Sequence, residues 1–293
     1  MRVPDFIKRD FPLARCSTLR VGGHADYFAV IDSLPRLQAV HYFATKNELD
    51  TLVVGRGSNI LFSDAGFRGL IMRMNMKKLG FNSDNDELWV EAGAHVSDIV
   101  TQGEFLGFSG FEEFAGLPGT IGGAIYGNAG CYGKQFWDVI EAVKFFNGND
   151  FVEVRVVPQF SGYRWSFFKE TPNLIIVSAK LKFEASDCEA VKKQTRKIRE
   201  KRQASQPSQS SAGCIFKNPS ASKNGAGQLI DECGLKGTAV GRAQISAKHG
   251  NFFVNLGGAS AYDFFELIKI AKSRVFQQTG ILLEEEIIMV GEF

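Results

Sequence analysis

The segment from Gly116 to Gly133, G-L-P-G-T-I-G-G-A-I-Y-G-N-A-G-C-Y-G, holds seven glycines in 18 residues and constrains the fold more than any other stretch. Each glycine inside a helix or strand costs roughly 0.5–1 kcal/mol in backbone entropy relative to alanine. A solvated linker tolerates such a density, but it would not also carry Leu117, Ile121, Ile125 and Tyr126. We therefore expect an ordered coil whose backbone closely approaches a bulky ligand.

A second glycine loop, G-R-G-S-N at 55–59, directly follows the apolar run Thr51–Val54, which predicts a short buried strand. Glycines at the end of a strand let backbone N–H groups point into one concavity, an arrangement that holds a pyrophosphate. The run matches neither the G-x-G-x-x-G fingerprint nor a Walker loop, so alone it is equally typical of a tight turn. Two such loops in one chain favour a long ligand such as a dinucleotide, with the Asn128 amide as a further contact.

The composition is that of a soluble globular protein without strong electrostatic partners. The 293 residues suffice for two domains, with 44% hydrophobic and 23% charged residues. The net charge of +2 gives no case for nucleic acid or a membrane surface. Five cysteines, an odd number without a C-x-x-C pair, argue against disulfides and zinc, and the four histidines show no metal spacing. The N-terminal residues lack the apolar core of a secretory signal, so we expect a reduced, cytoplasmic protein. We also expect a monomer.

Periodicity predicts alternating helices and strands. Ser33 is placed to cap a helix, Ser260 and Asp263 resemble a capping box, and Gly280 is placed to end the second helix. Residues 187–203 predict a charged helix whose basic residues form either a phosphate-binding face or, as we favour, a solvated face. Strands are expected at 26–31, 51–54, 70–74, 88–92 and 281–290. This order indicates an α/β or α+β protein.

The chain contains several long motifs: V-G-R-G-S-N-I-L, the glycine-rich segment, G-Y-R-W-S, A-G-C-I-F-K-N-P and K-H-G-N-F-F-V-N. Together they resemble one bacterial family, the UDP-N-acetylenolpyruvoylglucosamine reductases of peptidoglycan synthesis. The resemblance extends from residue 18 to residue 291. The interval between Tyr163 and Cys214 leaves little room for the tyrosine-bearing loop of one branch, so the shorter type is expected.

The resemblance implies an α+β fold in which an FAD-binding region of the vanillyl-alcohol-oxidase (PCMH) type precedes an α+β substrate domain. We place the FAD-binding region at 1–184, with subdomains at about 1–68 and 69–184, and the substrate-binding domain at 185–293. FAD is expected to be non-covalently bound, NADPH to be its reductant, and the substrate to be a UDP-sugar. The implied FAD contacts are Gly55, Arg56, Gly57, Ser58, Asn59, Ile60, Gly116, Pro118, Gly119, Thr120, Gly122, Gly123, Asn128 and Gly130.

By the same resemblance, the family reduces an enolpyruvyl ether to a lactyl ether, and charge develops on an enolate next to a carboxylate. Arg164 matches an active-site arginine, and a guanidinium can hold a carboxylate through two parallel hydrogen bonds. The family pattern L-E-x-E selects Glu286 rather than Glu285 as the active-site glutamate. Further substrate contacts are expected from Tyr163, Lys217, Asn218 and Asn251. For the last three, loop or capping roles are the alternatives.

Cys214 stands where the family commonly has serine as the proton donor. A thiol has an ordinary pKa of about 8.5, so it is largely protonated near neutral pH and can deliver a proton to a carbanion-like centre. Lys217, three residues away, would favour the thiolate, which cannot act as the acid. The alternative is an inert buried cysteine in a protein that has lost activity.

Two other functions compete with the reductase. An FAD-dependent oxidase or dehydrogenase with another substrate would share the glycine loops but not F-K-N-P or K-H-G-N-F-F-V-N. A non-catalytic flavin- or UDP-sugar-binding protein would keep the loops without needing Arg164, Cys214 and Glu286 together.

Overall fold

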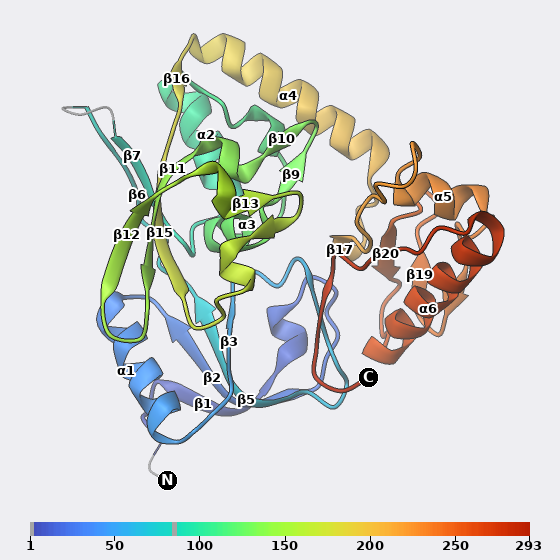
Figure 1. Cartoon of the computed structure of the whole chain (residues 1–293), viewed down its shortest axis with the longest axis horizontal. Helices are drawn as coiled ribbons and strands as arrows, with labels where there is room; N and C mark the ends of the chain where they lie inside the picture. The colour runs from blue at the N-terminus through green and yellow to red at the C-terminus, as the bar shows by residue number, and fades with distance from the viewer. Residues whose placement is uncertain (1–2, 84–86) are drawn as a thin grey trace. The chain divides into compact units, whose positions relative to one another are not determined.

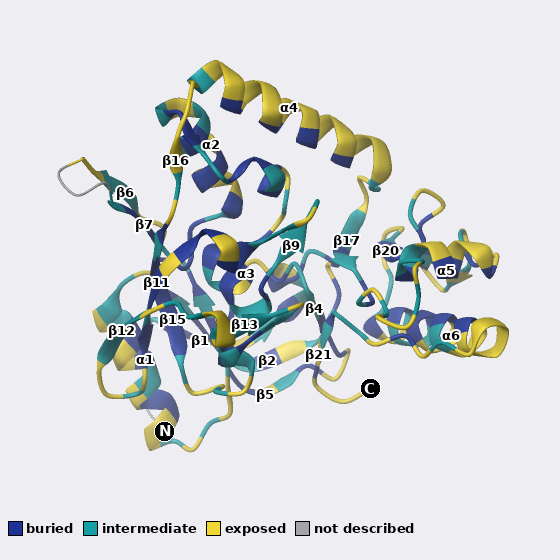
Figure 2. Ribbon diagram, turned by 45° about the horizontal axis from the view of Figure 1, so that its top comes forward, coloured by how far each residue is buried: buried dark blue, intermediate teal, exposed yellow. Residues whose placement is uncertain are grey.

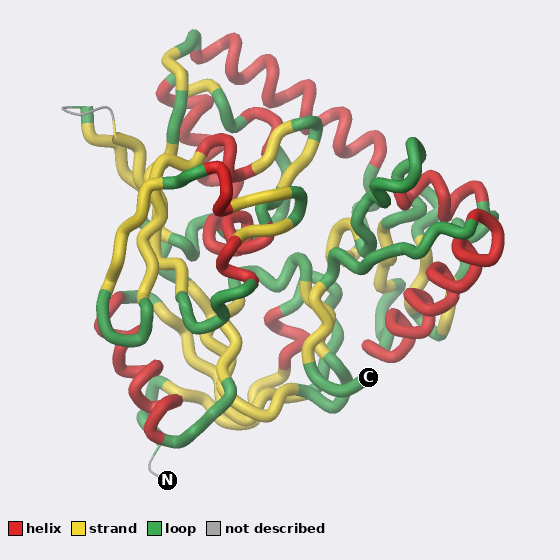
Figure 3. The backbone as a smooth tube through the Cα atoms, viewed as in Figure 1, coloured by secondary structure: helices red, strands yellow, loops and turns green. Residues whose placement is uncertain are grey.

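The computed structural model describes residues 3–83 and 87–293 and divides the chain into two compact units. The first comprises Met1–Ile7, Ala29–Arg56 and Ile71–Arg202, and the second comprises Lys8–Phe28, Gly57–Leu70 and Gln203–Phe293. Residues 1–2 and 84–86 lie outside the described part. Both units mix helices with strands, as Figure 3 shows, so the fold is α+β. The chain thus crosses between the units more often than the division at 184/185 expects.

The first unit is built around a five-stranded sheet in the order β12-β11-β15-β7-β6 (Figure 1). Helix α3 packs against β15 and β7. The helices are α1 (Leu34–Lys46), α2 (Val96–Leu106), α3 (Ile121–Gly127) and α4 (Cys188–Ser205), whose last turn crosses the unit boundary. The strands are β3 (Thr51–Val54), β6 (Leu79–Asn82), β7 (Glu87–Glu91), β8 (Phe108–Ser109), β9 (Gly130–Cys131), β10 (Lys134–Gln135), β11 (Ile140–Phe146), β12 (Phe151–Arg155), β13 (Ser161–Gly162), β14 (Trp165–Ser166), β15 (Ile175–Leu181) and β16 (Glu184–Ala185).

The second unit is a four-stranded sheet, β17-β20-β19-β18, with α6 packed against β19 and β18 and α5 packed against α6. Its buried core joins apolar residues of these elements to Leu19, Val21 and Leu61. The elements are β17 (Ser210–Cys214), α5 (Ala226–Glu232), β18 (Ala239–Val240), β19 (Ala243–Ile245), β20 (Phe252–Asn255), α6 (Ala261–Thr279), and the parallel pair β4 (Ile60–Phe62) and β21 (Ile288–Val290).

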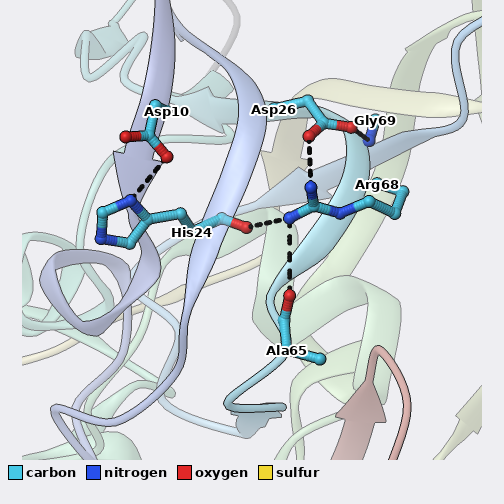
Figure 4. A network of polar contacts seen from close by, with 6 residues as sticks. All are labelled: Asp10, His24, Asp26, Ala65, Arg68 and Gly69. Atoms are coloured by element: carbon cyan, nitrogen blue, oxygen red, sulfur yellow. Dashed lines mark hydrogen bonds and ion pairs between the residues drawn. The ribbon is translucent and has the colours of Figure 1, made fainter.

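The boundary between the units falls within β1 (Ile7–Pro12), β2 (His24–Ile31) and β5 (Phe67–Met74), which form a sheet in the order β1-β2-β5-β3. Figure 4 shows polar contacts at the parts of these strands that belong to the second unit. His24 Nδ1 lies 2.7 Å from Asp10 Oδ1, and Arg68 Nη1 lies 2.8 Å from Asp26 Oδ1. These groups are largely exposed, so each pair contributes at most about 1 kcal/mol to stability.

The predicted helices are present. Ser33 caps α1 by accepting a hydrogen bond from the Arg36 amide at 3.4 Å. Ser260 and Asp263 form a capping box on α6, which ends at the left-handed Gly280 (φ 71°). Figure 2 shows α4 with one buried stripe and an otherwise exposed surface, as expected for a charged helix whose polar face is solvated.

The glycine-rich segment differs from the ordered coil predicted for it. Residues 121–127 form helix α3, and a β9–β10 hairpin follows. Thr120 caps the first turn by accepting a hydrogen bond from the Gly123 amide at 3.5 Å, and Asn128 ends the helix in the left-handed conformation. Burial of Ile121 and Ile125 anchors the helix. Capping and burial together outweigh the low helix propensity of its glycines.

Two strand predictions also need correction. Of the expected strand at 281–290, only Ile288–Val290 is a strand, so Glu286 lies before the strand instead of within it. The run Thr51–Val54 is a strand, but only Val54 is buried. The interval between Tyr163 and Cys214 was expected to leave little room for the tyrosine-bearing loop. It is taken up by the elements from β14 to β17.

Candidate active site

The start of the first glycine loop, Gly55 and Arg56, lies beside the second glycine loop in the first unit. A Cβ on Gly55 would come within 2.1 Å of Thr120 Oγ1, so only glycine permits this approach. A backbone hydrogen bond anchors the second loop to the start of α2, where the Val96 amide donates to Gly119 O at 3.2 Å. Arg56 Nη1 donates to His95 Nδ1 at 3.1 Å, while burial lowers the pKa of His95. The first unit thereby presents Gly55, Arg56 and residues 116–123 together.

The rest of the first glycine loop belongs to the second unit, where it is ordered by backbone contacts. The Thr18 amide donates to Gly57 O at 3.1 Å, and Asn59 Nδ2 donates to Glu286 O at 2.9 Å. The amide of Ile288 donates to Asn59 O at 3.0 Å. Residues 57–60 are therefore anchored to the chain segment that carries the predicted catalytic glutamate.

Arg164 occupies the tip of the β13–β14 hairpin, in a two-residue turn with Tyr163. Its φ of 54° lies in the left-handed region, which costs a non-glycine residue about 1–2 kcal/mol. Its Nη2 donates to Gly130 O at 2.8 Å, and its own carbonyl accepts a hydrogen bond from Lys169 Nζ at 2.7 Å. The Tyr163 ring is half exposed, with its centre 5.3 Å from the guanidinium carbon. The strained turn is thus held by specific contacts at a predicted functional residue.

Asn128 lies close to Arg164 but points into the protein. Its side chain is 1% exposed. Nδ2 donates to Gly162 O at 2.7 Å and to Gln135 Oε1 at 2.9 Å, and Oδ1 accepts from the Trp137 amide at 3.2 Å. The FAD contact expected of this amide would require it to leave these partners, so in this structure it connects backbone segments instead.

Cys214 and Glu286 lie on adjacent backbone segments of the second unit. Cys214 ends β17 opposite Phe252 of β20, and a bulge precedes it at the left-handed Gly213 (φ 76°). The next residue, Ile215, accepts a hydrogen bond from the Glu286 amide at 2.8 Å. The side chains of Cys214 and Glu286 are both half-buried. The structure therefore brings these two predicted catalytic residues together, and Arg164 belongs to the other unit.

The three predicted substrate contacts around Cys214 have partners within the protein. Lys217 Nζ contacts Glu284 Oε1, and Asn218 Oδ1 accepts from the Ala226 amide at 3.0 Å at the start of α5. Asn251 is 2% exposed; Oδ1 accepts from the Phe216 amide at 2.9 Å and Nδ2 donates to Phe216 O at 2.8 Å. Asn251 thus stabilises the loop after Cys214, and Lys217 and Asn218 are the more accessible members of this group.

Cys131, in the glycine-rich segment, lacks the lowered pKa of a reactive thiol. Burial raises the pKa of Cys131, whose Sγ donates to Glu113 O at 3.0 Å. Burial also raises the pKa of Tyr126. Within residues 3–83 and 87–293, no group of three or more histidine, cysteine or acidic residues is arranged to hold a metal ion. The same residues include no helix that is both long and apolar enough to cross a membrane.

Sequence reasoning missed Arg202, although the periodicity of α4 contains it. Val191, Thr195, Ile198 and Arg202 recur every three or four residues and form the buried stripe of this helix. Arg202 Nε donates to Ala115 O at 2.9 Å, at the start of the glycine-rich segment. Its charge groups it with the solvated residues of α4, but its spacing places it in the apolar stripe of the helix.

Comparison with known proteins first gives the class. A family model described as "FAD binding domain" matches residues 25–152, so the first part of the chain is a PCMH-type FAD-binding region followed by a separate C-terminal domain. A second model, "UDP-N-acetylenolpyruvoylglucosamine reductase, C-terminal domain", matches residues 206–290.

The chain is similar to the UDP-N-acetylenolpyruvoylglucosamine reductases of Chlamydia felis and Carboxydothermus hydrogenoformans. It is 38% identical to the first, covering 97% of this chain and 94% of the relative, and 36% identical to the second, covering 99% and 96%. It also matches the crystal structure of the reductase from Thermus caldophilus with a TM-score of 0.83 and 33% identity, covering 97% of this chain and 99% of that one. The chain therefore belongs to the UDP-N-acetylenolpyruvoylglucosamine reductases, FAD-containing oxidoreductases of peptidoglycan synthesis that use NADPH.

The glycine loops of the first unit fit an FAD molecule. A Cβ on Gly127 would meet nothing within 4 Å, and one on Gly123 would meet only Thr120 Oγ1 at 3.5 Å. Internal packing therefore gives no reason for glycine at either position, although each lowers the stability of α3. Space left open beside a backbone is the requirement for close approach of a flat or charged ligand. Within the first unit, residues 55–56 and the segment 116–127 would hold the cofactor.

Proposed function

We propose that this protein reduces the enolpyruvyl group of UDP-N-acetyl-3-O-(1-carboxyvinyl)glucosamine to give UDP-N-acetylmuramate, with Arg164, Cys214 and Glu286 as its catalytic residues. The observation that carries the proposal is the pairing of Cys214 and Glu286 on adjacent segments of a C-terminal domain that matches this family. Bound FAD, reduced by NADPH, supplies the hydride to the terminal enol carbon. The FAD-binding region is placed at 1–184 and the substrate-binding domain, which includes α4, at 185–293.

Arg164 binds the substrate carboxylate and stabilises the enolate that forms when the double bond accepts a hydride. A guanidinium is suited to this role because it is permanently charged and can donate two parallel hydrogen bonds. The half-exposed Tyr163 beside it contributes a further contact. Charge stabilisation by preorganised donors of this kind typically contributes 10²–10³-fold to a rate.

Cys214 donates the proton to the carbon next to the carboxylate. The S–H bond breaks and a C–H bond forms as the enolate collapses, and the resulting thiolate is reprotonated by solvent before the next turnover. Glu286, on the neighbouring segment, orients the substrate at this carbon. Lys217 and Asn218 bind more distant parts of the UDP-sugar, and they remain exposed enough to do so.

An anaerobic half-reaction experiment tests the proposal. The purified holoenzyme is reduced with one equivalent of NADPH, and the bleached flavin absorbance near 450 nm is followed after addition of the enolpyruvyl nucleotide. We expect rapid recovery of absorbance and stoichiometric UDP-N-acetylmuramate. Recovery only upon addition of oxygen would favour the alternative, an FAD-dependent oxidase or dehydrogenase with another substrate. A protein purified without bound flavin, and unable to take it up, would contradict both enzyme functions.

A further inference from the structure

The catalytic arginine is carried by a hairpin that the five-stranded sheet does not include. β13 and β14 form a separate two-stranded sheet of two residues each, and Arg164 lies in the turn between them. A hairpin this short is not stable by itself. The left-handed φ of 54° at Arg164 adds a local cost. Contacts from outside the hairpin must therefore keep the guanidinium in place.

Asn128 provides the central contact of this kind. Nδ2 donates to Gly162 O at 2.7 Å, two residues before Arg164, and the same nitrogen donates to Gln135 Oε1 at 2.9 Å. Ser166 Oγ, two residues after Arg164, donates to Tyr126 O at 2.7 Å. Hydrogen bonds before and after the turn, at Gly162 and Ser166, therefore connect it to the end of α3. Both of the fastening side chains, Asn128 and Ser166, are at most 1% exposed.

We propose that Asn128 is a positioning residue for catalysis, which acts on the substrate through Gly162 and Arg164 without touching it. The proposal rests on the proposed role of Arg164. Asn128 also sets the acceptor for the guanidinium, because the chain continues from it through Ala129 to Gly130, whose carbonyl accepts from Arg164 Nη2 at 2.8 Å. One residue therefore fixes both the backbone before the arginine and the partner of its side chain.

Asparagine meets the requirements of this position better than its nearest relatives. Residue 128 is left-handed (φ 43°), a conformation that asparagine tolerates better than most side chains. The side chain must donate twice and accept once, which an amide can do. Aspartate keeps the shape and the acceptor for the Trp137 amide but loses both donors. Gln135 can rotate its amide to meet aspartate, whereas Gly162 O cannot become a donor.

The first test is Asn128→Asp in the FAD-loaded enzyme. We expect the rate of enolpyruvyl reduction to fall about 10- to 100-fold, since a displacement of about 1 Å can cost up to about 10²-fold. Reduction of the flavin by NADPH should change less than about threefold, because no enolate forms in that step. UDP-N-acetylmuramate binding, measured by calorimetry, should weaken about tenfold through the lost carboxylate contact. Asn128→Gly, which tolerates the left-handed backbone and buries no charge, should give the same pattern if the aspartate variant does not fold.

A matched control is Asn47→Asp, at the end of α1 in the same unit. Asn47 Nδ2 donates to Phe43 O at 2.7 Å, so this change also removes a local amide donor. We expect a lower urea midpoint and unchanged half-reaction rates. Equal losses of enolpyruvyl reduction in Asn47→Asp and Asn128→Asp would overturn the positioning role.

The double variant separates the inference from the proposed function. If Asn128 acts through Arg164, Asn128→Asp should cause no further loss of rate in an Arg164→Met background. Multiplying losses would overturn the inference while leaving Arg164 catalytic. An Arg164→Met enzyme that reduces the enolpyruvyl group within twofold of the native rate would instead overturn the proposed function.

Discussion

Arg164 in the first unit and Cys214 in the second each lie near a buried asparagine, but the two regions are built differently. Cys214 is part of a strand and pairs with Phe252 in the β17–β20 ladder. Arg164 lies on a hairpin tip outside the large sheet. The Asn128 side chain holds the hairpin at Gly162, and the guanidinium donates to the Gly130 carbonyl. The buried asparagines are Asn128 near the arginine and Asn251 near the cysteine.

Because of this difference, Asn128 is expected to affect the position of the catalytic guanidinium, and Asn251 the stability of the second unit. Loss of Asn128 leaves the five-stranded sheet intact and loosens a short hairpin, so the expected consequence is a misplaced guanidinium. Loss of Asn251 breaks two buried hydrogen bonds to Phe216, which belongs to the apolar core of the second unit. The expected consequence there is a less stable domain in which the folded molecules still hold Cys214 through the strand ladder.

The largest effect is expected for Cys214→Ala, which removes the proposed proton donor itself and not a residue that positions the site. Enolpyruvyl reduction should fall about 10³-fold, a typical contribution of general acid catalysis, while flavin reduction by NADPH continues. Cys214→Ser should retain substantial activity because its hydroxyl can also deliver a proton. Stopped-flow absorbance of both half-reactions measures this. An alanine variant with normal turnover would show that another group supplies the proton.

The same thiol predicts a difference in pH dependence. The native enzyme should lose rate on the alkaline limb as Cys214 ionises, since a thiolate cannot act as the acid. Cys214→Ser should lack that loss, because an alcohol does not ionise in this range. Profiles of enolpyruvyl reduction between pH 7 and 10 provide the measurement, and identical alkaline limbs would make Cys214 a bystander.

Asn251→Asp tests the stability side of the comparison. A carboxylate keeps the hydrogen bond from the Phe216 amide but places an oxygen against Phe216 O, 2.8 Å from the present nitrogen. An unsatisfied buried group costs about 1–3 kcal/mol, and a buried charge costs more. We expect the free energy of unfolding in urea to fall by about 3 kcal/mol, with half-reaction rates of the folded protein within about threefold of native. A large loss of enolpyruvyl reduction in an Asn251→Asp protein of native stability would contradict the difference drawn between Asn128 and Asn251.

Gly130→Ala tests the position of the Arg164 guanidinium in the first unit, because it moves this group directly. A Cβ at residue 130 would lie 2.7 Å from Arg164 Nη1 and 3.0 Å from Lys134 O, and the backbone of Gly130 does not need a left-handed φ. The flexible end of Arg164 should yield, so enolpyruvyl reduction should fall about tenfold with little change in the urea midpoint. In an Arg164→Met background the alanine should have no further effect on rate. An additional loss there would mean that Gly130 acts on something other than the arginine.

Local patterns predicted much of the fold and the identities of the catalytic candidates. The caps at Ser33 and Ser260 and the apolar stripes behind them located α1 and α6. Arg164, Cys214 and Glu286 came from ordered family motifs. The helix in the glycine-rich segment was missed because its stability comes from Thr120, Asn128 and buried isoleucines, which outweigh residue propensity only in the folded protein.

The supports of the site were not predictable because their partners are distant in sequence. Asn128 and Gly162 are 34 residues apart, Ser166 and Tyr126 are 40 apart, and Asn251 and Phe216 are 35 apart. No periodicity or spacing rule indicates such pairs. The sequence indicated an amide at 128 near a ligand, whereas only the three-dimensional arrangement reveals that this amide faces the protein.

The smallest expected effect is a pH dependence of stability that belongs only to the Cys214 region. His249 precedes Asn251, and its Nδ1 accepts a hydrogen bond from the Asn251 amide at 3.2 Å. Burial, with a smaller contribution from Lys236, lowers the pKa of His249 below the ordinary value of 6.5. The unfolded chain therefore takes up a proton near pH 6.5 that the native protein resists. The stability contributed by neutral His249 is complete above that pH and is lost as the pH falls toward the lower native pKa.

His249→Gln should accordingly lose less unfolding free energy than the native protein between pH 7.5 and 5.5. Urea unfolding at several pH values measures the difference between the two proteins. His41 and His95, whose pKa values burial also lowers, are common to both and cancel in that difference. The Arg164 hairpin at 161–166 contains no histidine, so Asn128→Gly, which adds no titratable group, should shift the whole stability curve without changing this part of its slope. Parallel curves for the native protein and His249→Gln would show that His249 does not couple the Asn251 loop to pH.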